Sequence, residues 1–458
     1  MRQIPTTNSR HFRVSGRSSA WVSALGNAPV EHRQGSRDMP NSLPDSLDVI
    51  IAGAGPAGHF AGIPFFHDQI DTTRWPYRLS GSMGSLPTDM AALEAVLTQR
   101  ATAMGITIRR GCAVGDFEQS GTEIRVRTET GTYRGRWLVG CDGGRSTVRK
   151  NAGIRFGGTE PEFTGYSAQA ELADPARLKP GRHYTPAGMY TYAPSGMIAM
   201  VDFDDGAFHR TQPIDRTHIE AVLRRLSGID VTITGLTHAT TWTDRACQAI
   251  DYRKGRVLLA GDAAHVHAPL GDQGLNPGLG DAMNLGWKLA ATIRGTAPTG
   301  LLDSYAQERY PAGEQILDWS RAQVALMRPT RSTRALQAII RDLIGTRDDA
   351  TCFAGRVWGI DLRYDFQGTH PLAGRSVPDF ELADGTRLNE HLRSGRGLLL
   401  DAACCASRRS AAERCCGQID YVAGALKDFP DLNGVLVRPD GVIAWASDDI
   451  PNDNEDLT

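Results

Sequence analysis

The feature that most constrains the fold is one continuous segment that reads as a strand, an acidic turn, a glycine-rich loop and a helix. Residues 257–260 form a short apolar run, the pattern of a buried strand. Gly261 and Asp262 follow and place a carboxylate at the strand's carboxyl end, where open α/β sheets bind ligands. The loop leads to a helix predicted over residues 281–293, whose N-terminus offers free N–H groups and partial positive charge. The segment can therefore hold a sugar hydroxyl with Asp262, and a negatively charged ring edge with the loop and the helix.

A glycine-rich turn near the N-terminus supplies a second ligand-binding pattern. Residues 48–52 have the composition of a buried strand, and they run into a complete G-x-G-x-x-G sequence at residues 53–58. Glycines in such a turn allow the backbone to approach a pyrophosphate closely. The motif alone is common, and the strand before it strengthens the prediction.

The sequence after Gly58 departs from a dinucleotide-binding unit. Such a unit needs a helix, a second strand and an acidic residue about 20 residues beyond the glycines, which binds ribose. Here Gly62 and Pro64 make a long helix implausible, and no second strand ending in Glu follows. The chain reads as if the helix, the second strand and its Glu had been deleted. Genuine divergence and an artefact of the gene sequence both remain open.

A third motif combines an acidic turn with a basic residue. Residues 138–141 read as a strand end, and Asp142, Gly143 and Arg145 follow. The Asp can accept hydrogen bonds from a ribose or orient the loop, the glycine allows close approach, and Arg145 can meet a phosphate. The simpler alternative is a strand, turn and helix with a salt bridge.

These three motifs, in this order, resemble the class A flavoprotein monooxygenases, the FAD-dependent aromatic hydroxylases. The longest match comprises Gly261-Asp262 with His265, the loop around Pro269 to Asn276, and the helix sequence DAMNLGWKL at residues 281–289. The resemblance covers roughly residues 47–447 and is closest to the aromatic polyketide and rifampicin-type hydroxylases. It implies FAD as cofactor, NADPH or NADH as reductant, and the following cofactor-binding residues: Gly53, Gly55, Pro56, Ala57, Gly58, Asp142, Gly143, Arg145, Asp262, Pro269, Gly271, Gly274, Leu275 and Asn276.

The resemblance also implies the reaction. NAD(P)H reduces FAD, reduced flavin reacts with dioxygen, and the flavin hydroperoxide transfers one oxygen to an electron-rich aromatic ring. The cofactor carries this chemistry, so no side chain is assigned as acid or base, and His265 and His267 are interpreted as structural. Asp272 is expected to point outward, because a carboxylate would oppose negative charge on reduced flavin. The missing ribose-binding segment leaves two alternatives: a flavin-poor inactive relative, and a non-catalytic protein that binds aromatic ligands.

The implied architecture is an α/β fold with several units. An FAD/NAD(P)-binding Rossmann-like domain comprises residues 47–154 and 251–330, interleaved with a substrate-covering β-sheet domain at 155–250. A helical connector at 331–369 leads to a thioredoxin-like C-terminal α/β domain at 370–458, and residues 1–46 read as a disordered extension. The C-terminal domain has no C-x-x-C, so a packing or homodimer role is the default.

The sheet domain would wall the substrate cavity. Strands are predicted at residues 163–172, 183–192 and 197–203, and another at 106–114 in the first domain. Candidate lining residues in the sheet domain are Met189, Tyr190, Tyr192 and Met197, with plain sheet core as the simpler alternative. Farther along, the segment from Leu302 is expected to be a structural helix with an exposed Glu308–Arg309 pair.

The composition gives no indication of a nucleic-acid or membrane partner. The chain has 458 residues and a formal charge of −2, which does not favour nucleic acid. No apolar run approaches the ~18 residues of a membrane span. The eight cysteines lack zinc-site spacing and are expected to be free thiols in a reducing cytoplasm. The expected partners are a small aromatic substrate and dioxygen.

Overall fold

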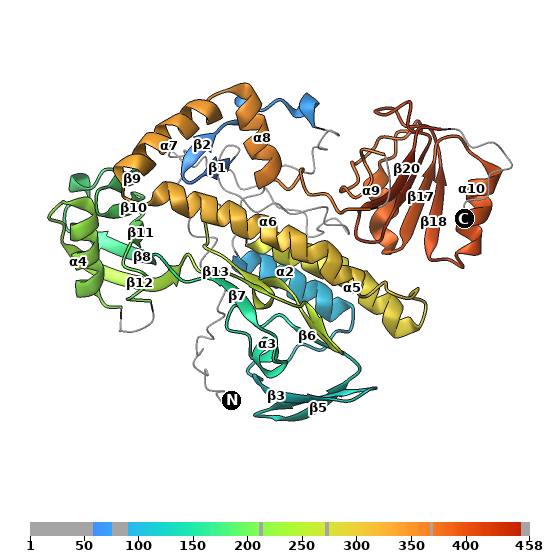
Figure 1. The fold of residues 1–458 in the computed structure, drawn as a ribbon, viewed down its shortest axis with the longest axis horizontal. Helices are drawn as coiled ribbons and strands as arrows, with labels where there is room; N and C mark the ends of the chain where they lie inside the picture. The colour runs from blue at the N-terminus through green and yellow to red at the C-terminus, as the bar shows by residue number, and fades with distance from the viewer. Residues whose placement is uncertain (1–57, 76–89, 210–213, 271–273, 367–369, 450–458) are drawn as a thin grey trace, which may run out of the picture.

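The computed structural model describes residues 58–75, 90–209, 214–270, 274–366 and 370–449. Within these ranges the chain is an α/β protein. Two long helices, α5 (Leu275–Arg294) and α6 (Ser304–Met327), run through the middle of the molecule with sheets on either side (Figure 1). The following predicted features lie outside the described residues: the extension at 1–46, the strand at 48–52, and Gly53, Gly55, Pro56, Ala57, Gly271 and Asp272.

Two small sheets near the centre carry the acidic turns. In the first, β15 (Val257–Leu259) pairs in parallel with β6 (Leu138–Gly140) and antiparallel with β14 (Arg253–Lys254). Leu259 lies opposite Gly140, so the turns that follow these two strands leave the same edge of the sheet. The second sheet has the order β16 (His265–Val266), β13 (Ala246–Ala249) and β7 (Phe156–Thr159).

An outlying sheet and two helices complete this part of the chain. Its strands are β3 (Val114–Gln119), β4 (Ile124–Thr128) and β5 (Gly131–Gly135), and its helices are α2 (Met90–Ala103) and α3 (Thr147–Asn151). The strand predicted at residues 106–114 is wrong, because residues 106–113 form no strand. Ile106 and Ile108 are 54% and 44% exposed. Within the described ranges no strand pairs with them, and an isolated extended segment is not stable in water.

A five-stranded antiparallel sheet lies at one end of the molecule (Figure 1). Helix α4 (Arg216–Ser227) covers one of its faces. The strand predicted at residues 183–192 is instead a hairpin, which turns at residues 186–187. In spatial order the strands are β12 (Ile233–Thr243), β8 (Thr164–Leu172), β11 (Met197–Asp202), β10 (Gly188–Tyr192) and β9 (Gly181–Thr185).

A short hairpin follows Gly58 in place of a helix. Strands β1 (Gly58–Phe60) and β2 (Ile63–Phe65) are antiparallel, and they pack against helices α7 (Arg331–Ile344) and α8 (Arg347–Val357) (Figure 1). Phe60 contacts Trp319 of α6 with ring centroids 4.5 Å apart. The hairpin is therefore part of the apolar core that joins α6, α7 and α8.

The C-terminal part forms its own sheet at the other end of the molecule (Figure 1). Its strand order is β18 (Ile419–Ala423), β17 (Gly397–Asp401), β19 (Gly434–Val437) and β20 (Ile443–Ser447), with β17 and β18 parallel. Helices α9 (Leu388–His391) and α10 (Ala406–Arg414) accompany it. Short 3₁₀ helices are η2 (His67–Gln69), η3 (Thr72–Arg74), η5 (Pro175–Arg177), η6 (Gly261–Ala263) and η7 (Leu392–Ser394).

None of the helices in the described ranges is both long and apolar enough to span a bilayer.

Candidate functional site

The turn after β15 packs directly against the start of α5. Gly261 has φ = +61°, a left-handed conformation that favours glycine. A side chain there would lie 3.9 Å from the Cα of Gly278, itself a glycine on α5. The two glycines let η6, which contains Asp262, approach the first turns of α5.

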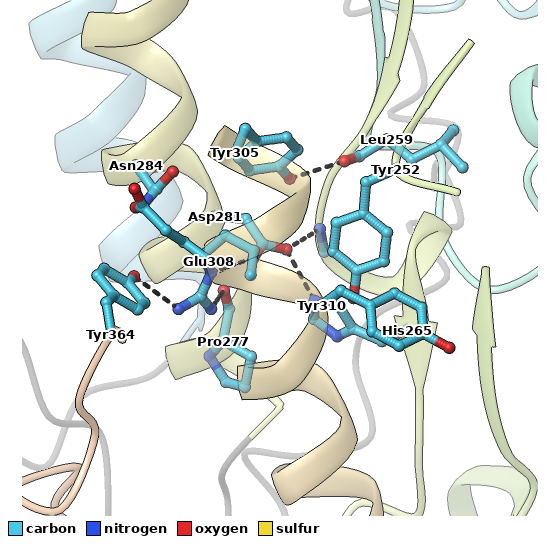
Figure 2. A network of polar contacts seen from close by, with 12 residues as sticks. Tyr252, Leu259, His265, Pro277, Asp281, Asn284, Tyr305, Glu308, Tyr310 and Tyr364 are labelled. Carbon is cyan, nitrogen blue, oxygen red and sulfur yellow. Dashed lines mark hydrogen bonds and ion pairs between the residues drawn. The ribbon is translucent and has the colours of Figure 1, made fainter. Parts of the chain in front are cut away.

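A buried carboxylate on α5 organises this turn (Figure 2). Asp281 is fully buried, and its Oδ2 accepts hydrogen bonds from the Gly261 N–H at 2.8 Å and from His265 Nε2 at 2.7 Å. Its Oδ1 accepts from Arg309 Nε at 2.7 Å. Burial opposes ionisation, but the hydrogen bond from His265 and the charge of Arg309 hold the pKa of Asp281 below its ordinary value.

Two residues of helix α6, Arg309 and Tyr305, make further hydrogen bonds around this turn. Arg309 also donates to the Pro277 carbonyl at 3.0 Å and to the Tyr364 hydroxyl at 3.1 Å. The Tyr305 hydroxyl donates to the Leu259 carbonyl at 2.7 Å (Figure 2). The end of β15, the start of α5 and the middle of α6 therefore form one hydrogen-bonded unit. The sequence did not predict that Asp281 and Arg309 pair, although both lie in segments that resemble the family.

Three polar features at this turn have no protein partner within the described ranges. The Asp262 carboxylate has no hydrogen-bond partner among the described residues, and burial raises its pKa. Helix α5 begins at Leu275, six residues before the predicted start, and no side chain caps it at Gly274. The Asn276 Oδ1 is buried and has no hydrogen-bond partner in the part of the chain that the structure describes. Polar groups without a protein partner are places where a polar ligand could bind.

The Asp142 motif is held by its own loop. The Asp142 carboxylate accepts hydrogen bonds from the Ser146 hydroxyl, from Thr147 N at 2.7 Å and from Val148 N at 3.1 Å, so it caps α3. Gly143 has φ = +79°, and Arg145 is exposed. These contacts correspond to the loop-orienting role considered for Asp142.

Arg149 links the two acidic turns, a role that the sequence did not indicate. Its guanidinium donates to the Ala263 and Gly144 carbonyls, both at 2.9 Å, and stacks over the Phe156 ring at 3.7 Å. Burial lowers its pKa. It therefore fixes the loop around Gly143 beside the turn around Asp262.

The described loop residues between β16 and α5 are enclosed. Pro269 and Leu270 are buried, and Gln323 of α6 donates to the Leu270 carbonyl at 3.5 Å. His267 contacts the Ala268 carbonyl at 2.8 Å, and burial lowers its pKa to about 4, so the imidazole is neutral. A side chain added at Gly274 would lie 3.8 Å from the His267 ring, an ordinary van der Waals distance and the shortest to any described residue.

Gly58 lies in a different setting from the predicted loop. It pairs with Phe65 in β1 and β2, and a side chain on it would lie 2.7 Å from the Phe65 ring. Packing in the hairpin therefore explains a glycine at this position.

The four candidate substrate residues divide between the two faces of one sheet. Met189 belongs to the cluster that contains Phe60, Phe65 and Leu270. Met197 alternates with Ile198 and so faces the same side. Tyr190 and Tyr192 instead lie on the opposite face, where they are buried among the apolar residues of α4.

Comparisons with known proteins agree with this arrangement. The FAD binding domain family matches residues 83–320, and the aromatic-ring hydroxylase C-terminal family matches residues 370–458. A monooxygenase of Claviceps purpurea is 42% identical over 397 residues, which cover 86% of this chain and 78% of that protein. A rifampicin monooxygenase of Streptomyces venezuelae is 35% identical, over 86% of this chain and 81% of that protein. The structure of the OxyS anhydrotetracycline hydroxylase from Streptomyces rimosus superposes with a TM-score of 0.75 at 36% identity, covering 86% of this chain and 81% of that one.

Proposed function

The chain belongs to the FAD-dependent aromatic-ring monooxygenases, and we propose that it hydroxylates an aromatic molecule of the polyketide or antibiotic type, with NADH or NADPH as reductant. Its substrates are accordingly a small molecule and dioxygen. The two alternatives that the sequence left open, an inactive relative and a non-catalytic binding protein, have no support in the comparisons.

The single observation that carries the proposal is the group of polar features after β15 that have no partner among the described residues. The flavin end of FAD offers hydroxyls on its ribityl chain and a ring edge that becomes negative on reduction. The unpaired Asp262 carboxylate fits a hydroxyl donor, and the uncapped N-terminus of α5 fits the negative ring edge. Asn276, with its unpaired oxygen, adds a hydrogen-bonding partner. The residues present therefore fit the group.

The other proposed FAD contacts come from residues that lie beside Asp262 and the start of α5. Gly274 and Leu275 lie at the start of α5, and Pro269 in the loop before it. Asp142, Gly143 and Arg145 follow β6 at the same edge of the sheet, where they would serve the nucleotide end of a cofactor. When bound, FAD supplies hydride acceptance and the activation of dioxygen. The protein's part is to orient FAD, stabilise its negative charge and exclude water.

The domain arrangement is also a proposal. We propose an FAD-binding domain at residues 47–154 and 251–330, a substrate-covering sheet at 155–250, a helical connector at 331–369 and a thioredoxin-like C-terminal domain at 370–458. The parallel β17–α10–β18 unit beside the antiparallel β19 and β20 supports the last of these. For this domain we propose a role in packing or in homodimer formation. We also propose that the protein is cytoplasmic.

The test is oxygen incorporation into an aromatic probe. The purified protein is supplied with FAD, NADPH or NADH, and isotopically labelled dioxygen, with anhydrotetracycline and rifampicin as probes. We expect at least one probe to stimulate NAD(P)H oxidation and to gain one labelled oxygen atom by mass spectrometry. If probes bind but neither stimulate NAD(P)H oxidation nor gain oxygen, the protein is a ligand-binding relative and the proposal fails.

A further inference from the structure

Asp281 lies beside the proposed cofactor turn but is occupied by protein. Its carboxylate, with no exposed surface, already accepts three hydrogen bonds, from Gly261 N, His265 Nε2 and Arg309 Nε, at 2.7–2.8 Å. A carboxylate occupied in this way has little capacity left for a ligand. Its effect on a ligand must therefore come through the groups that it holds.

Of the three groups that Asp281 binds, the Gly261 N–H lies nearest in sequence to the proposed FAD contact. It belongs to the residue directly before Asp262, in a turn with a left-handed backbone conformation. The Asp262 carboxylate has no hydrogen-bond partner of its own among the described residues. Its direction is therefore set by the backbone of the turn, and that backbone is fixed by Asp281.

We infer that Asp281 is a positioning residue for FAD, which acts through Gly261 on Asp262, and that Arg309 and Tyr364 hold it from outside the turn. Arg309 reaches Asp281 from α6 and donates to Tyr364, which lies in the segment leading to the C-terminal sheet. The Arg438 guanidinium of that sheet's hairpin turn lies 5.6 Å from the Tyr364 ring centre. The inference rests on the proposed contact between Asp262 and FAD.

The chain contains a matched control for Asp281. Asp401 in the C-terminal sheet is also fully buried, and it also accepts from a backbone N–H, an arginine and one further side chain. Its donors are Cys405 N at 2.6 Å, Arg408 at 3.0 Å and the Tyr421 hydroxyl at 2.8 Å. Asp401→Asn should therefore reduce stability much as Asp281→Asn does, without any contact with the proposed site.

The experiment titrates FAD into the full-length apoprotein and measures the Kd, the melting temperature and the midpoint potential of bound FAD. We expect Asp281→Asn to weaken FAD binding by about tenfold or more, the equivalent of one charge-assisted hydrogen bond. The potential should shift upward, because the charge of Arg309 is then left without its buried partner. Asp401→Asn should lower the melting temperature but change the FAD Kd by less than about twofold.

The outcomes separate the inference from its premise. If Asp262→Asn binds FAD as tightly as the wild type, the proposed FAD contact fails. If Asp262→Asn binds weakly while folded Asp281→Asn keeps the wild-type Kd and potential, the inference alone fails. Equal weakening by Asp401→Asn also overturns it, since the effect is then one of general stability. If Asp281→Asn does not fold, Tyr364→Phe removes one hydroxyl only; we expect about a two- to threefold weaker Kd, and an unchanged Kd overturns the inference.

Discussion

Four charged side chains meet in the interior between α5, α6 and the C-terminal sheet. Lys288 of α5 is fully buried, 2.9 Å from Glu308 of α6. Glu308 also accepts two hydrogen bonds from Arg438 at 2.8–2.9 Å, and Arg438 pairs with Asp440. Two positive charges therefore face two negative ones. Such a cluster is stable only while complete, because removing one partner leaves an uncompensated buried charge.

The pH dependence of stability should reveal the buried ammonium of Lys288. Burial is the main reason that its pKa falls from 10.5 to about 8, despite the opposing effect of Glu308. Between these values the unfolded chain binds more protons than the folded one, so this group's contribution to stability rises with pH. Relative to Lys288→Met, the wild type should gain roughly 1 kcal/mol of unfolding free energy per pH unit between about pH 8 and 10. Urea unfolding at several pH values measures this.

The control for Lys288 is Lys427. Its ammonium pairs with Glu381 at 2.6 Å, but its side chain is 47% exposed. Because the Lys427 side chain stays in contact with solvent, Lys427→Met should not reproduce the effect of Lys288→Met between about pH 8 and 10. A profile for Lys288→Met that is parallel to the wild type would contradict the buried charge.

At the level of single residues, the sequence predicts features formed by neighbouring residues in the chain, but not contacts between distant ones. The turn of Gly261 and Asp262 is readable because a glycine and an acid directly follow an apolar run. The pairing of Asp281 with Arg309 is not readable, because the two residues lie on different helices, 28 positions apart. The expectation that Glu308 and Arg309 form an exposed pair is wrong. Arg309 is 2% exposed, and the two residues bind different partners, Lys288 and Asp281.

At the scale of the elements, strand β10 has one face in each of two apolar clusters. Its alternate side chains point to opposite faces, with Met189 in the cluster that contains the hairpin residue Phe60 and the loop residue Leu270. Tyr192 packs on the other face, among the apolar residues of α4. Of the two faces of β10, the one that contains Met189 packs in the same cluster as Leu270, in the loop before α5.

Conservative substitutions on the two faces of β10 should have different effects. We expect Met189→Leu, which nearly conserves volume and costs less than about 1.5 kcal/mol, to change the KM for the aromatic substrate by about three- to tenfold. Tyr192→Phe should leave KM unchanged. Steady-state kinetics with melting temperatures measures both, and equal changes in KM would show that the face of β10 does not decide substrate contact.

The sequence predicted the existence of most elements better than their ends. The strands at 163–172 and 197–203 are confirmed as β8 and β11 to within one residue. The segment 183–192, predicted as one strand, contains Pro186 and Gly188, which favour a turn. The chain turns back at residues 186–187 and forms β9 and β10. Helix α5 starts six residues early because Gly274 and Pro277 suit a first helical turn, which the glycine-rich composition concealed.

At the scale of the whole molecule, the sequence lacks the helix, second strand and Glu that normally follow a glycine-rich nucleotide-binding turn. The chain spans about four fifths of the length of the relatives it matches, and the FAD binding domain match begins at residue 83, beyond the glycines at 53–58. In the described part, Gly58 leads into a hairpin rather than a helix. The Asp262 carboxylate and the N-terminus of α5, to which we assign the flavin-side contacts, are both described after β15. FAD binding must therefore depend on these contacts together with the Asp142 turn.

A titration of the purified full-length protein with FAD, followed by its visible spectrum, tests this requirement most directly. We predict saturable binding with flavin absorption bands near ~370 and ~450 nm, and loss of the longer-wavelength band when NADPH or NADH is added without oxygen. If FAD stays unbound even in large excess, this chain cannot be a working flavin monooxygenase, and the account is contradicted.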